Sequence, residues 1–395
     1  MKWNNRGHEF DIVAEKLLQN QEKFRCIYIF GAGLIGANLT AVLQAYGILA
    51  GFIDNDIKKQ HEGYKGYAVY SFEEYRKEHK GFIVIAASDK NIPPISKQLE
   101  DADLSEEQDF VTHTKFCNEI FPIVSVYLFS KVYIDVAQIS LTERCSLKCR
   151  KCAHGCFAVD NSRAKDLTIE QVYKSADSFF GRVDFVREFV LIGGEPMLYK
   201  QLPEAVQYIG ERYGKQIGVF SITTNGTILP DEKLLRVCNA QNVLFRISNY
   251  SGTIARLKNT YNMLTKLLDQ NGVAYELGME EKEWMDYGFD CVDRIADADE
   301  LIRVFDTCKT PCREVRENRY YFCVMARSVS DNMGFHIGKD DFLDLDVLTG
   351  EQYKKEFMEF NFGYSDKGYL DMCRHCNGAD SAKYPIPAAE QVDSH

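Results

Sequence analysis

The sequence has no long hydrophobic run. Its longest nearly apolar stretch, Phe121 to Phe129, is far shorter than the roughly 18 residues that indicate a membrane-spanning helix. The first residues, MKWNNRGHEFDIVAEKLLQ, also lack the basic, apolar and small-residue segments of a signal peptide. We therefore expect a cytoplasmic protein with no membrane partner.

An excess of positive charge is absent as well. The 395 residues include 47 Lys and Arg against 58 Asp and Glu, which gives a net charge of −11. Proteins that bind nucleic acid through bulk charge carry the opposite excess, so nucleic acid is not an expected partner. Hydrophobic residues make up 45% of the chain, which is enough to fill the cores of two or three domains.

Internal repeats and low-complexity blocks are also absent. Instead, β-branched or aromatic runs alternate with helix-patterned stretches to about residue 280, which is typical of an α/β chain with a parallel sheet. The alternation stops after about residue 284. The expected strands are residues 26–30, 50–53 and 82–87 in a first unit, and 133–140, 188–192, 217–222, 243–247 and 273–277 in a second.

Cysteine is plentiful and clustered. Thirteen cysteines in a large cytoplasmic chain would mostly stay reduced, so metal binding, catalysis or packing must explain them. Cys145, Cys149 and Cys152 stand in CSLKCRKC, directly after an expected strand. Three thiolates on a short loop can hold three irons of a 4Fe–4S cluster and leave the fourth iron open. Because Cys156 follows, a four-cysteine structural zinc site is the alternative.

A second motif ends the next expected strand, where Phe189 to Ile192 runs into Gly193, Gly194, Glu195 and Pro196. CSLKCRKC and GGEP together resemble the radical SAM superfamily. The resemblance implies that the open iron chelates the amino and carboxylate groups of S-adenosylmethionine. It also implies that the GGEP loop binds the amino group, with glycines that allow close approach and a glutamate that supplies an anion for the ammonium.

The resemblance continues at the ends of the following strands. Thr223 and Asn225, in TTNG, and then Ser248 and Asn249 look like the family's contacts to the ribose and the methionyl carboxylate. Every motif falls at the carboxyl end of an expected strand, where α/β folds build their sites. The family usually has an aromatic residue before the third cysteine, and Lys151 takes that place here.

Five further cysteines gather near the C-terminus. Their layout is similar to the twitch and SPASM extensions of some radical SAM proteins, which carry an auxiliary 4Fe–4S cluster. We expect one auxiliary cluster on four of the five thiols, with a ribbon-like zinc site as the alternative. Asn318 would take the left-handed conformation where the pattern has glycine. The five are Cys308, Cys312, Cys323, Cys373 and Cys376.

A glycine-rich turn opens the first unit. Gly31, Gly33 and Gly36 stand in GAGLIG between an expected strand and an expected helix over residues 34–46, and Asp54 ends the next strand. This context fits a dinucleotide-binding fingerprint, in which glycines serve the turn, pyrophosphate approach and packing, and the acid meets a ribose hydroxyl. We expect a nucleotide or sugar nucleotide here; hydride transfer and a vestigial or docking fold are the alternatives.

These observations predict an α/β protein of three parts. We expect a Rossmann-like domain over residues 1–115, a linker over 116–132, a partial (β/α)6 TIM-type radical SAM barrel over 133–285, a small C-terminal iron–sulfur domain over 286–380 and a tail over 381–395. Side chains that could face substrate are harder to select from sequence. Catalytic candidates are Glu276, Asp286 and Tyr287, which together with Trp284 could line the open mouth of the barrel. His154 and Cys156 lie close to the cysteine loop and could face substrate; a surface or packing role is the alternative for all six.

The resemblance implies a reaction. Reductive cleavage of S-adenosylmethionine gives a 5′-deoxyadenosyl radical that abstracts a hydrogen atom from substrate, with electrons from a donor such as flavodoxin or ferredoxin. The attached nucleotide-type module favours oxidation or epimerisation of a sugar or a nucleotide-linked sugar. Radical modification of a ribosomally made peptide is one alternative, and a non-catalytic, zinc-stabilised binding protein is the other.

Overall fold

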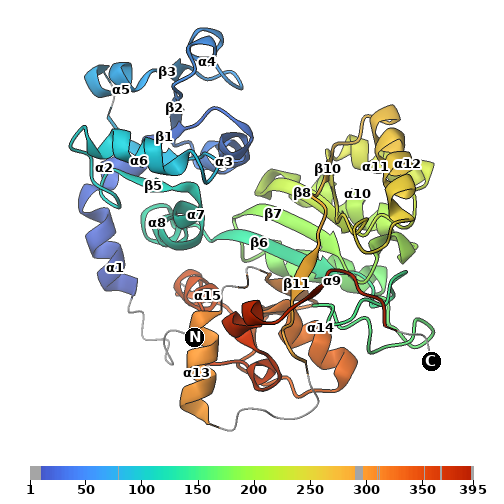
Figure 1. The fold of residues 1–395 in the computed structure, drawn as a ribbon. Coiled ribbons are helices and arrows are strands. Elements are labelled where there is room, and N and C mark those ends of the chain that lie inside the picture. The colour runs from blue at the N-terminus through green and yellow to red at the C-terminus, as the bar shows by residue number, and fades with distance from the viewer. Residues whose placement is uncertain are drawn as a thin grey trace. The chain divides into compact units, whose positions relative to one another are not determined.

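The computed structural model describes residues 10–78, 80–289, 297–308, 310, 312–350, 352–364 and 367–392. It divides into two compact units (Figure 1). The N-terminal unit comprises His8–Asp135 and Val183–Arg187, and the C-terminal unit comprises mainly Val136–Arg182 and Glu188–His395. Within the described ranges, no helix combines the length and the hydropathy that a membrane crossing needs.

The N-terminal unit contains a parallel sheet in the order β3-β2-β1-β4-β5. The strands and helix expected from the sequence in this unit are confirmed, with ends moved by one or two residues. Because β2 and β4 flank β1, the strand order reverses at β1, and doubly wound sheets form their ligand crevice at such a point. The strands are β1 (Ile27–Phe30), β2 (Leu49–Ile53), β3 (Val69–Tyr70), β4 (Phe82–Ile85) and β5 (Phe110–Thr112).

Helices connect these strands. Asp56 caps one of them, α4, by accepting a hydrogen bond from the Lys58 amide. The helices of the unit are α1 (Phe10–Leu17), α2 (Gln21–Phe24), α3 (Leu34–Ala45), α4 (Ile57–Glu62), α5 (Phe72–Glu78), α6 (Ile92–Glu100), α7 (His113–Lys115) and α8 (Phe121–Phe129).

Residues 116–132 do not form the expected linker. They hold a π-helical turn, Phe116–Ile120, followed by α8, and their side chains lie in the same buried core as Ile27 and Phe82. The residues 183–187 complete this unit, since the Asp184 carboxylate accepts the Val132 amide at 2.8 Å. The apolar run that looked like a connection is apolar because it is buried on nearly every side.

The C-terminal unit contains a mixed sheet in the order β10-β9-β8-β7-β6-β12-β13-β14. The five strands expected between residues 133 and 277 are confirmed. Neighbours β8 and β9, and β9 and β10, run parallel. The strands are β6 (Tyr133–Ser140), β7 (Phe185–Ile192), β8 (Ile217–Thr224), β9 (Leu244–Ile247), β10 (Tyr275–Leu277), β12 (Glu314–Arg316), β13 (Arg319–Tyr321) and β14 (Phe342–Asp344).

The cysteine-rich region after residue 286 differs from the expected separate domain. Strand β12 pairs parallel with β6, and the hairpin β12–β13 continues antiparallel to β14, so this region extends the same sheet. It also falls in the same compact unit as the strands before it. In the hairpin the left-handed residue is Glu317, at φ +54°, rather than Asn318. The amide of Asn318 is instead used to donate to Asp344 at 3.0 Å.

Helices connect the strands of this unit too. Thr168 starts α9 with a capping box, in which its hydroxyl accepts the Gln171 amide and the Gln171 side chain accepts the Thr168 amide. The helices are α9 (Ile169–Phe180), α10 (Leu202–Tyr213), α11 (Glu232–Ala240), α12 (Leu257–Gln270), α13 (Ala298–Thr307), α14 (Val324–Met333) and α15 (Tyr353–Asn361).

The expected tail over residues 381–395 is ordered as far as it is described. Strand β15 (Pro385–Pro387) pairs antiparallel with β11 (Glu283–Met285). Pro385 and Pro387 are tolerated in β15 because the sheet has two strands in the described part of the chain, so each strand has an edge that needs no donors. Beyond β15, Gln391 forms an antiparallel bridge with Cys149.

Candidate functional site

The three cysteines of CSLKCRKC follow β6 and pack into one buried cluster. Cys145, Cys149 and Cys152 lie there with Cys156 and Ala389. Burial raises the pKa of the Cys145 and Cys149 thiols to about 12, because an unpaired thiolate is poorly solvated there. The hydrogen bond from Cys156 lowers the pKa of Cys152 to about 7.

Each of these three sulfurs receives an N–H hydrogen bond. The Leu147 amide reaches the Cys145 sulfur at 3.4 Å, and the His154 amide reaches that of Cys152 at 3.4 Å. The side chain of Gln391 reaches the Cys149 sulfur at 3.2 Å. Donors aimed at sulfur are the surroundings that a metal-bound thiolate requires.

The donor set fits an iron–sulfur cluster. In the described ranges, no three His, Cys, Asp or Glu side chains converge as tightly as the ligands of a single ion. A cube of four irons instead places one thiolate on each of three corners and leaves one corner open. The Cys145 and Cys149 thiols are buried and their pKa values are raised, so positively charged irons would be the partners that hold these thiols deprotonated.

The GGEP loop lies against the start of the cysteine loop. The Gly194 amide donates to the Thr142 carbonyl and the Glu195 amide to the Arg144 carbonyl, both at 2.8 Å. A Cβ on Gly193 or Gly194 would lie 2.5 or 2.2 Å from those carbonyl oxygens. Glycine is therefore required for this close approach, as well as for the φ of +155° at Gly193.

Glu195 differs from its expected role as an anion for a ligand ammonium. Its carboxylate is fully buried and accepts hydrogen bonds from the Thr224 hydroxyl, the Asn225 amide and the Met197 amide, at 2.8, 2.9 and 3.1 Å. Burial raises the pKa of Glu195 to about 7. The side chain thus joins the end of β7 to the end of β8, and only the loop backbone remains to meet a ligand.

The motifs after β8 and β9 lie where the sequence indicated. Asn225 directs its amide nitrogen to the Cys145 sulfur at 3.6 Å and to the Ser146 hydroxyl at 3.1 Å. Thr223 lies at the end of β8, and Ser248 follows β9, with its amide bonded to the Thr224 carbonyl. Asn249 donates to the Gly278 carbonyl at 3.1 Å, which ties this turn to the end of β10. These residues thus lie at neighbouring strand ends, and Asn225 brings one of these ends to the cysteine loop.

Pro196 begins a 3-10 turn, Pro196–Leu198, that follows Glu195. Trp284 donates its indole N–H to Glu281 and packs edge-on against Tyr250, beside the cysteine cluster. Lys151, at φ +58°, donates to the Gly288 carbonyl and lies 3.7 Å from Asp286. Asp286 is therefore paired with a cation rather than available as a free base. Tyr287 lies near the C-terminal cysteines, and burial raises its pKa.

Sequence reasoning missed a row of polar side chains across the sheet. Glu188 on β7 accepts the Ser221 hydroxyl from β8 at 2.8 Å and pairs with Arg246 on β9 at 2.5 and 3.0 Å. Arg246 also pairs with Glu276 on β10. The available signal was a charged residue in the middle of an apolar strand, as in FVREFVLI and LFRI.

Four of the five C-terminal cysteines line one largely enclosed, apolar cavity. These are Cys308, Cys323, Cys373 and Cys376, which come together with side chains such as Phe305. Cys312 is not among the lining residues, and its carbonyl accepts the Val324 amide. The structure thus brings four of the five thiols to the lining of one cavity, a grouping that the spacing alone left open.

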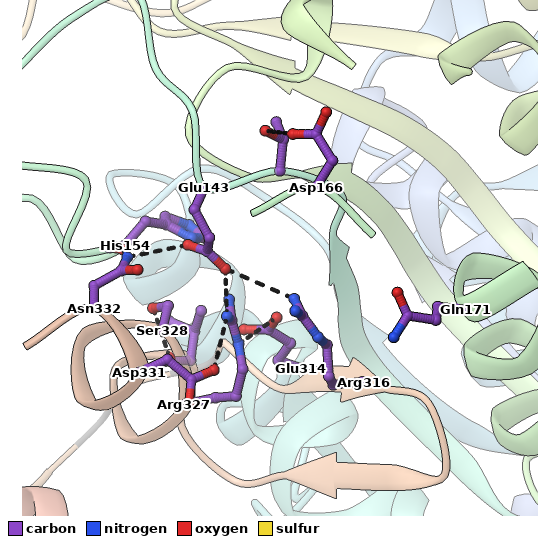
Figure 2. Close-up of polar contacts among 12 residues, drawn as sticks. Glu143, His154, Asp166, Gln171, Glu314, Arg316, Arg327, Ser328, Asp331 and Asn332 are labelled. Carbon is purple, nitrogen blue, oxygen red and sulfur yellow. Dashed lines mark hydrogen bonds and ion pairs between the residues drawn. The ribbon is translucent and has the colours of Figure 1, made fainter. Parts of the chain in front are cut away.

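A buried ion-pair network joins α14 to β12 and to Glu143, which precedes the cysteine loop (Figure 2). Arg327 is 1% exposed and lies 2.5 Å from Glu143, three residues beyond the end of β6, and 2.8 Å from Glu314 on β12. Asn332, on the same helix, donates to Glu143 at 3.1 Å and to the His154 carbonyl at 2.9 Å. Desolvation of the half-buried ring lowers the pKa of His154 to about 4.

The glycine turn of the N-terminal unit opens a crevice of about 670 Å³ at the carboxyl ends of β1, β2 and β4. A Cβ on Gly31 or Gly36 would lie 2.4 or 2.2 Å from a backbone oxygen, whereas one on Gly33 would meet open space. In the fingerprint, glycines serve the turn, the packing of helix on strand and the approach of a ligand, and the crowding at Gly31 and Gly36 and the open space at Gly33 agree with these roles. Lys59 lines the crevice and adds a positive charge.

Asp54 differs from its expected contact with a ribose. Its carboxylate accepts the Ala32 amide at 2.8 Å, the Asp56 amide at 2.9 Å and the Lys59 ammonium at 3.0 Å. Both oxygens are thus bonded within the unit. Asp54 fastens the glycine turn and positions Lys59 at the crevice.

Part of the chain is similar to a known protein family. The model of the radical SAM superfamily matches residues 139–253. The GTP 3′,8-cyclase of Ectopseudomonas mendocina (strain ymp) is 34% identical over 98 residues, which cover 25% of this chain and 28% of that protein. Molybdenum cofactor biosynthesis protein 1 of Dictyostelium discoideum is 32% identical over 111 residues, which cover 28% and 17%. The chain thus matches less than a third of the length of these relatives.

Solved structures with a partial likeness include BtrN in complex with AdoMet and 2-DOIA. It is 18% identical, with a TM-score of 0.40, over 66% of this chain and 98% of that chain. SuiB of Streptococcus suis, bound to precursor peptide SuiA, is 14% identical, with a TM-score of 0.30, over 48% and 45%. The family match contains CSLKCRKC, GGEP and TTNG, which confirms the resemblance drawn from them. Residues 139–253 of the chain thus match the radical SAM superfamily.

Proposed function

We propose that this chain is a radical SAM enzyme that acts on a small polar molecule of the sugar or nucleotide-linked sugar class. When bound, a 4Fe–4S cluster supplies the electron that cleaves S-adenosylmethionine into a radical able to take a hydrogen atom from substrate. Cys145, Cys149 and Cys152 would hold three of its irons. The backbone at Gly193 and Gly194 would accept the methionyl amino group.

The observation that carries the substrate class is the polar row on β7 to β10. Side chains two residues apart on a strand share a face, so Arg246 shares a face with Ser248, and Ser221 with Thr223. The row therefore lies on the face that carries the strand-end motifs. The Arg246 and Glu276 side chains are 31% and 42% exposed, which leaves them able to bond hydroxyl or phosphate groups.

We further propose two accessory sites. Cys308, Cys323, Cys373 and Cys376 would hold one auxiliary 4Fe–4S cluster, because they line one apolar cavity. The N-terminal crevice would take the diphosphate of a nucleotide or sugar nucleotide, because Lys59 and the open space at Gly33 favour an anion. A low-potential donor such as flavodoxin or ferredoxin would supply electrons.

The test is formation of 5′-deoxyadenosine by anaerobic, reduced protein. We expect cleavage by the wild type, none by Cys145→Ala, and retained cleavage by the matched Cys156→Ala, since the open iron needs no fourth thiol. Iron should fall from about eight per chain to about four when Cys145, Cys149 and Cys152 are all changed to Ala. Undiminished cleavage by Cys145→Ala contradicts the proposal.

The substrate arm uses Arg246→Met, tested against sugars, sugar nucleotides and peptides. We expect uncoupled cleavage of S-adenosylmethionine to continue, because the charged partners of Arg246 are Glu188 and Glu276 rather than cysteine ligands, while turnover of a sugar-class substrate is lost. Turnover of a peptide, and of no sugar or sugar nucleotide, would replace the sugar class by the peptide class.

A further inference from the structure

The last described residues of the chain run along the cysteine loop. The Arg150 amide donates to the Glu390 carbonyl at 2.7 Å, and the Val392 amide donates to the Lys148 carbonyl at 2.8 Å. These two backbone bonds flank Cys149, which forms the bridge with Gln391. The segment is therefore held in register with the cysteine loop by its backbone, independently of the Gln391 side chain.

The side-chain amide of Gln391 has one possible orientation. Its nitrogen donates to the Ala389 carbonyl at 2.7 Å and to the Cys149 sulfur at 3.2 Å, and its oxygen accepts the Lys148 amide at 2.8 Å. A flipped amide would bring oxygen against the carbonyl and the sulfur, and NH₂ against an N–H donor. The network thus fixes an N–H group on the sulfur.

This donor differs in kind from those on the other two cysteines. The amides of Leu147 and His154 lie two residues from the cysteines they serve and come with the loop itself. The donor to Cys149 is the side chain of Gln391, which lies 242 residues further along the sequence and is exposed, next to the fully buried Ala389. It can therefore be removed by substitution without changing the loop sequence.

We propose that Gln391 tunes the reduction potential of the cluster held by Cys145, Cys149 and Cys152, by donating a hydrogen bond to the Cys149 sulfur. This inference rests on the proposed function. On reduction, one electron passes from an external low-potential donor to the cluster, and no bond in Gln391 forms or breaks. An N–H group on a thiolate sulfur stabilises the added negative charge, so it makes reduction easier. Gln391 is a positioning residue, since it acts on the cluster through Cys149.

The test is Gln391→Met, which keeps the length of the side chain and removes the donor. The matched control is Glu390→Gln, which removes the Arg150–Glu390 ion pair of 3.2 Å in the same segment but leaves the sulfur contact. The potential is measured by anaerobic redox titration followed by electron paramagnetic resonance. The relevant signal is the one that Cys145→Ala lacks. We expect Gln391→Met to be harder to reduce by about tenfold, or about 59 mV, and Glu390→Gln to match the wild type.

A second outcome is that Gln391→Met loses this cluster but keeps the iron of the auxiliary site, while Glu390→Gln keeps both clusters. That result also supports the proposal, because the hydrogen bond to the Cys149 sulfur is then needed to hold the cluster. An unchanged potential in Gln391→Met overturns it, as does an equal shift or equal iron loss in both variants. A wild-type chain with no iron–sulfur signal is a different outcome, since it contradicts the proposed function instead.

Discussion

Removing the Arg327 guanidinium should loosen the contact between α14 and the cysteine loop. Arg327 is 1% exposed, Glu314 is fully buried, and the Glu143 side chain is 6% exposed. In Arg327→Met these two carboxylates lose their shared cation without gaining water. Breaking a buried ion pair on one side typically costs 3–5 kcal/mol, so we expect a loss of about 4 kcal/mol of local stability at pH 7.

The measurement is hydrogen exchange by mass spectrometry, which gives a free energy of opening for each segment. Peptides from β6 and α14 should exchange faster in Arg327→Met, and those of the N-terminal unit should not. The matched control is Arg303→Met. Its pair with Glu300 spans 3.0 Å, but the two side chains are 70% and 48% exposed, so we expect a change below about 1 kcal/mol.

The loss should depend on pH in a defined direction. In the native chain Glu143 is buried, but the nearby Arg327 and Arg316 hold its pKa below the usual value. A depressed carboxyl pKa gives stability that is present at neutral pH and lost as pH falls. The difference between the wild type and Arg327→Met should therefore shrink toward pH 4, and Glu314→Gln should partly rescue Arg327→Met at pH 7. A difference below 1 kcal/mol at pH 7, or one that grows on acidification, would refute this reasoning.

Two other substitutions separate binding from folding. Gly33→Val should keep the thermal midpoint of the N-terminal unit and abolish its binding of NAD or sugar nucleotides in calorimetry. Gly36→Val should instead unfold the unit, because the new side chain meets the Gly31 carbonyl. Normal nucleotide binding by Gly33→Val would contradict the assignment of the crevice as a nucleotide site. Burial raises the pKa of Glu195 from 4.5 to about 7, so the folded state alone holds the proton between these values and stability falls as pH rises through that window. The stability of the wild type relative to Glu195→Gln should fall by about 3 kcal/mol from pH 4.5 to 7 and stay level above it; a flat profile would contradict the burial argument.

The sequence contained the strand-end motifs and the order of the elements. The alternation of apolar runs and helix patterns located the strands of both sheets because that pattern reflects burial, which is local in sequence. The glycine spacing also predicted three separate roles for Gly31, Gly33 and Gly36, and the space around each glycine differs accordingly. The strand-end motifs predicted which loops meet because parallel strands end at one edge of a sheet.

Contacts between distant segments could not be read in the same way. Arg327 lies 184 residues from Glu143, and Gln391 lies 242 residues from Cys149. Neither residue stands in a motif, and only the fold brings them to the cysteine loop. The sequence singled out Glu195 and Asp54, but it could not show the bonds that their carboxylates make within the chain. A charged group in a motif can bond to its own chain as readily as to a ligand, and the choice depends on which donors the fold places around it.

The N-terminal unit is closed by a segment that the ribosome makes late. Phe185 lies in the core of that unit, and Arg187 pairs with Asp135 at 2.6 and 3.0 Å. During synthesis, residues 136–182, with all of CSLKCRKC, leave the ribosome before this closing segment. The N-terminal unit therefore cannot complete its fold until residues 183–187 have been synthesised, by which time the cysteine loop has already left the ribosome. For the same reason no single cut frees the unit intact, so evolution and protein engineering alike must move it together with the start of β7.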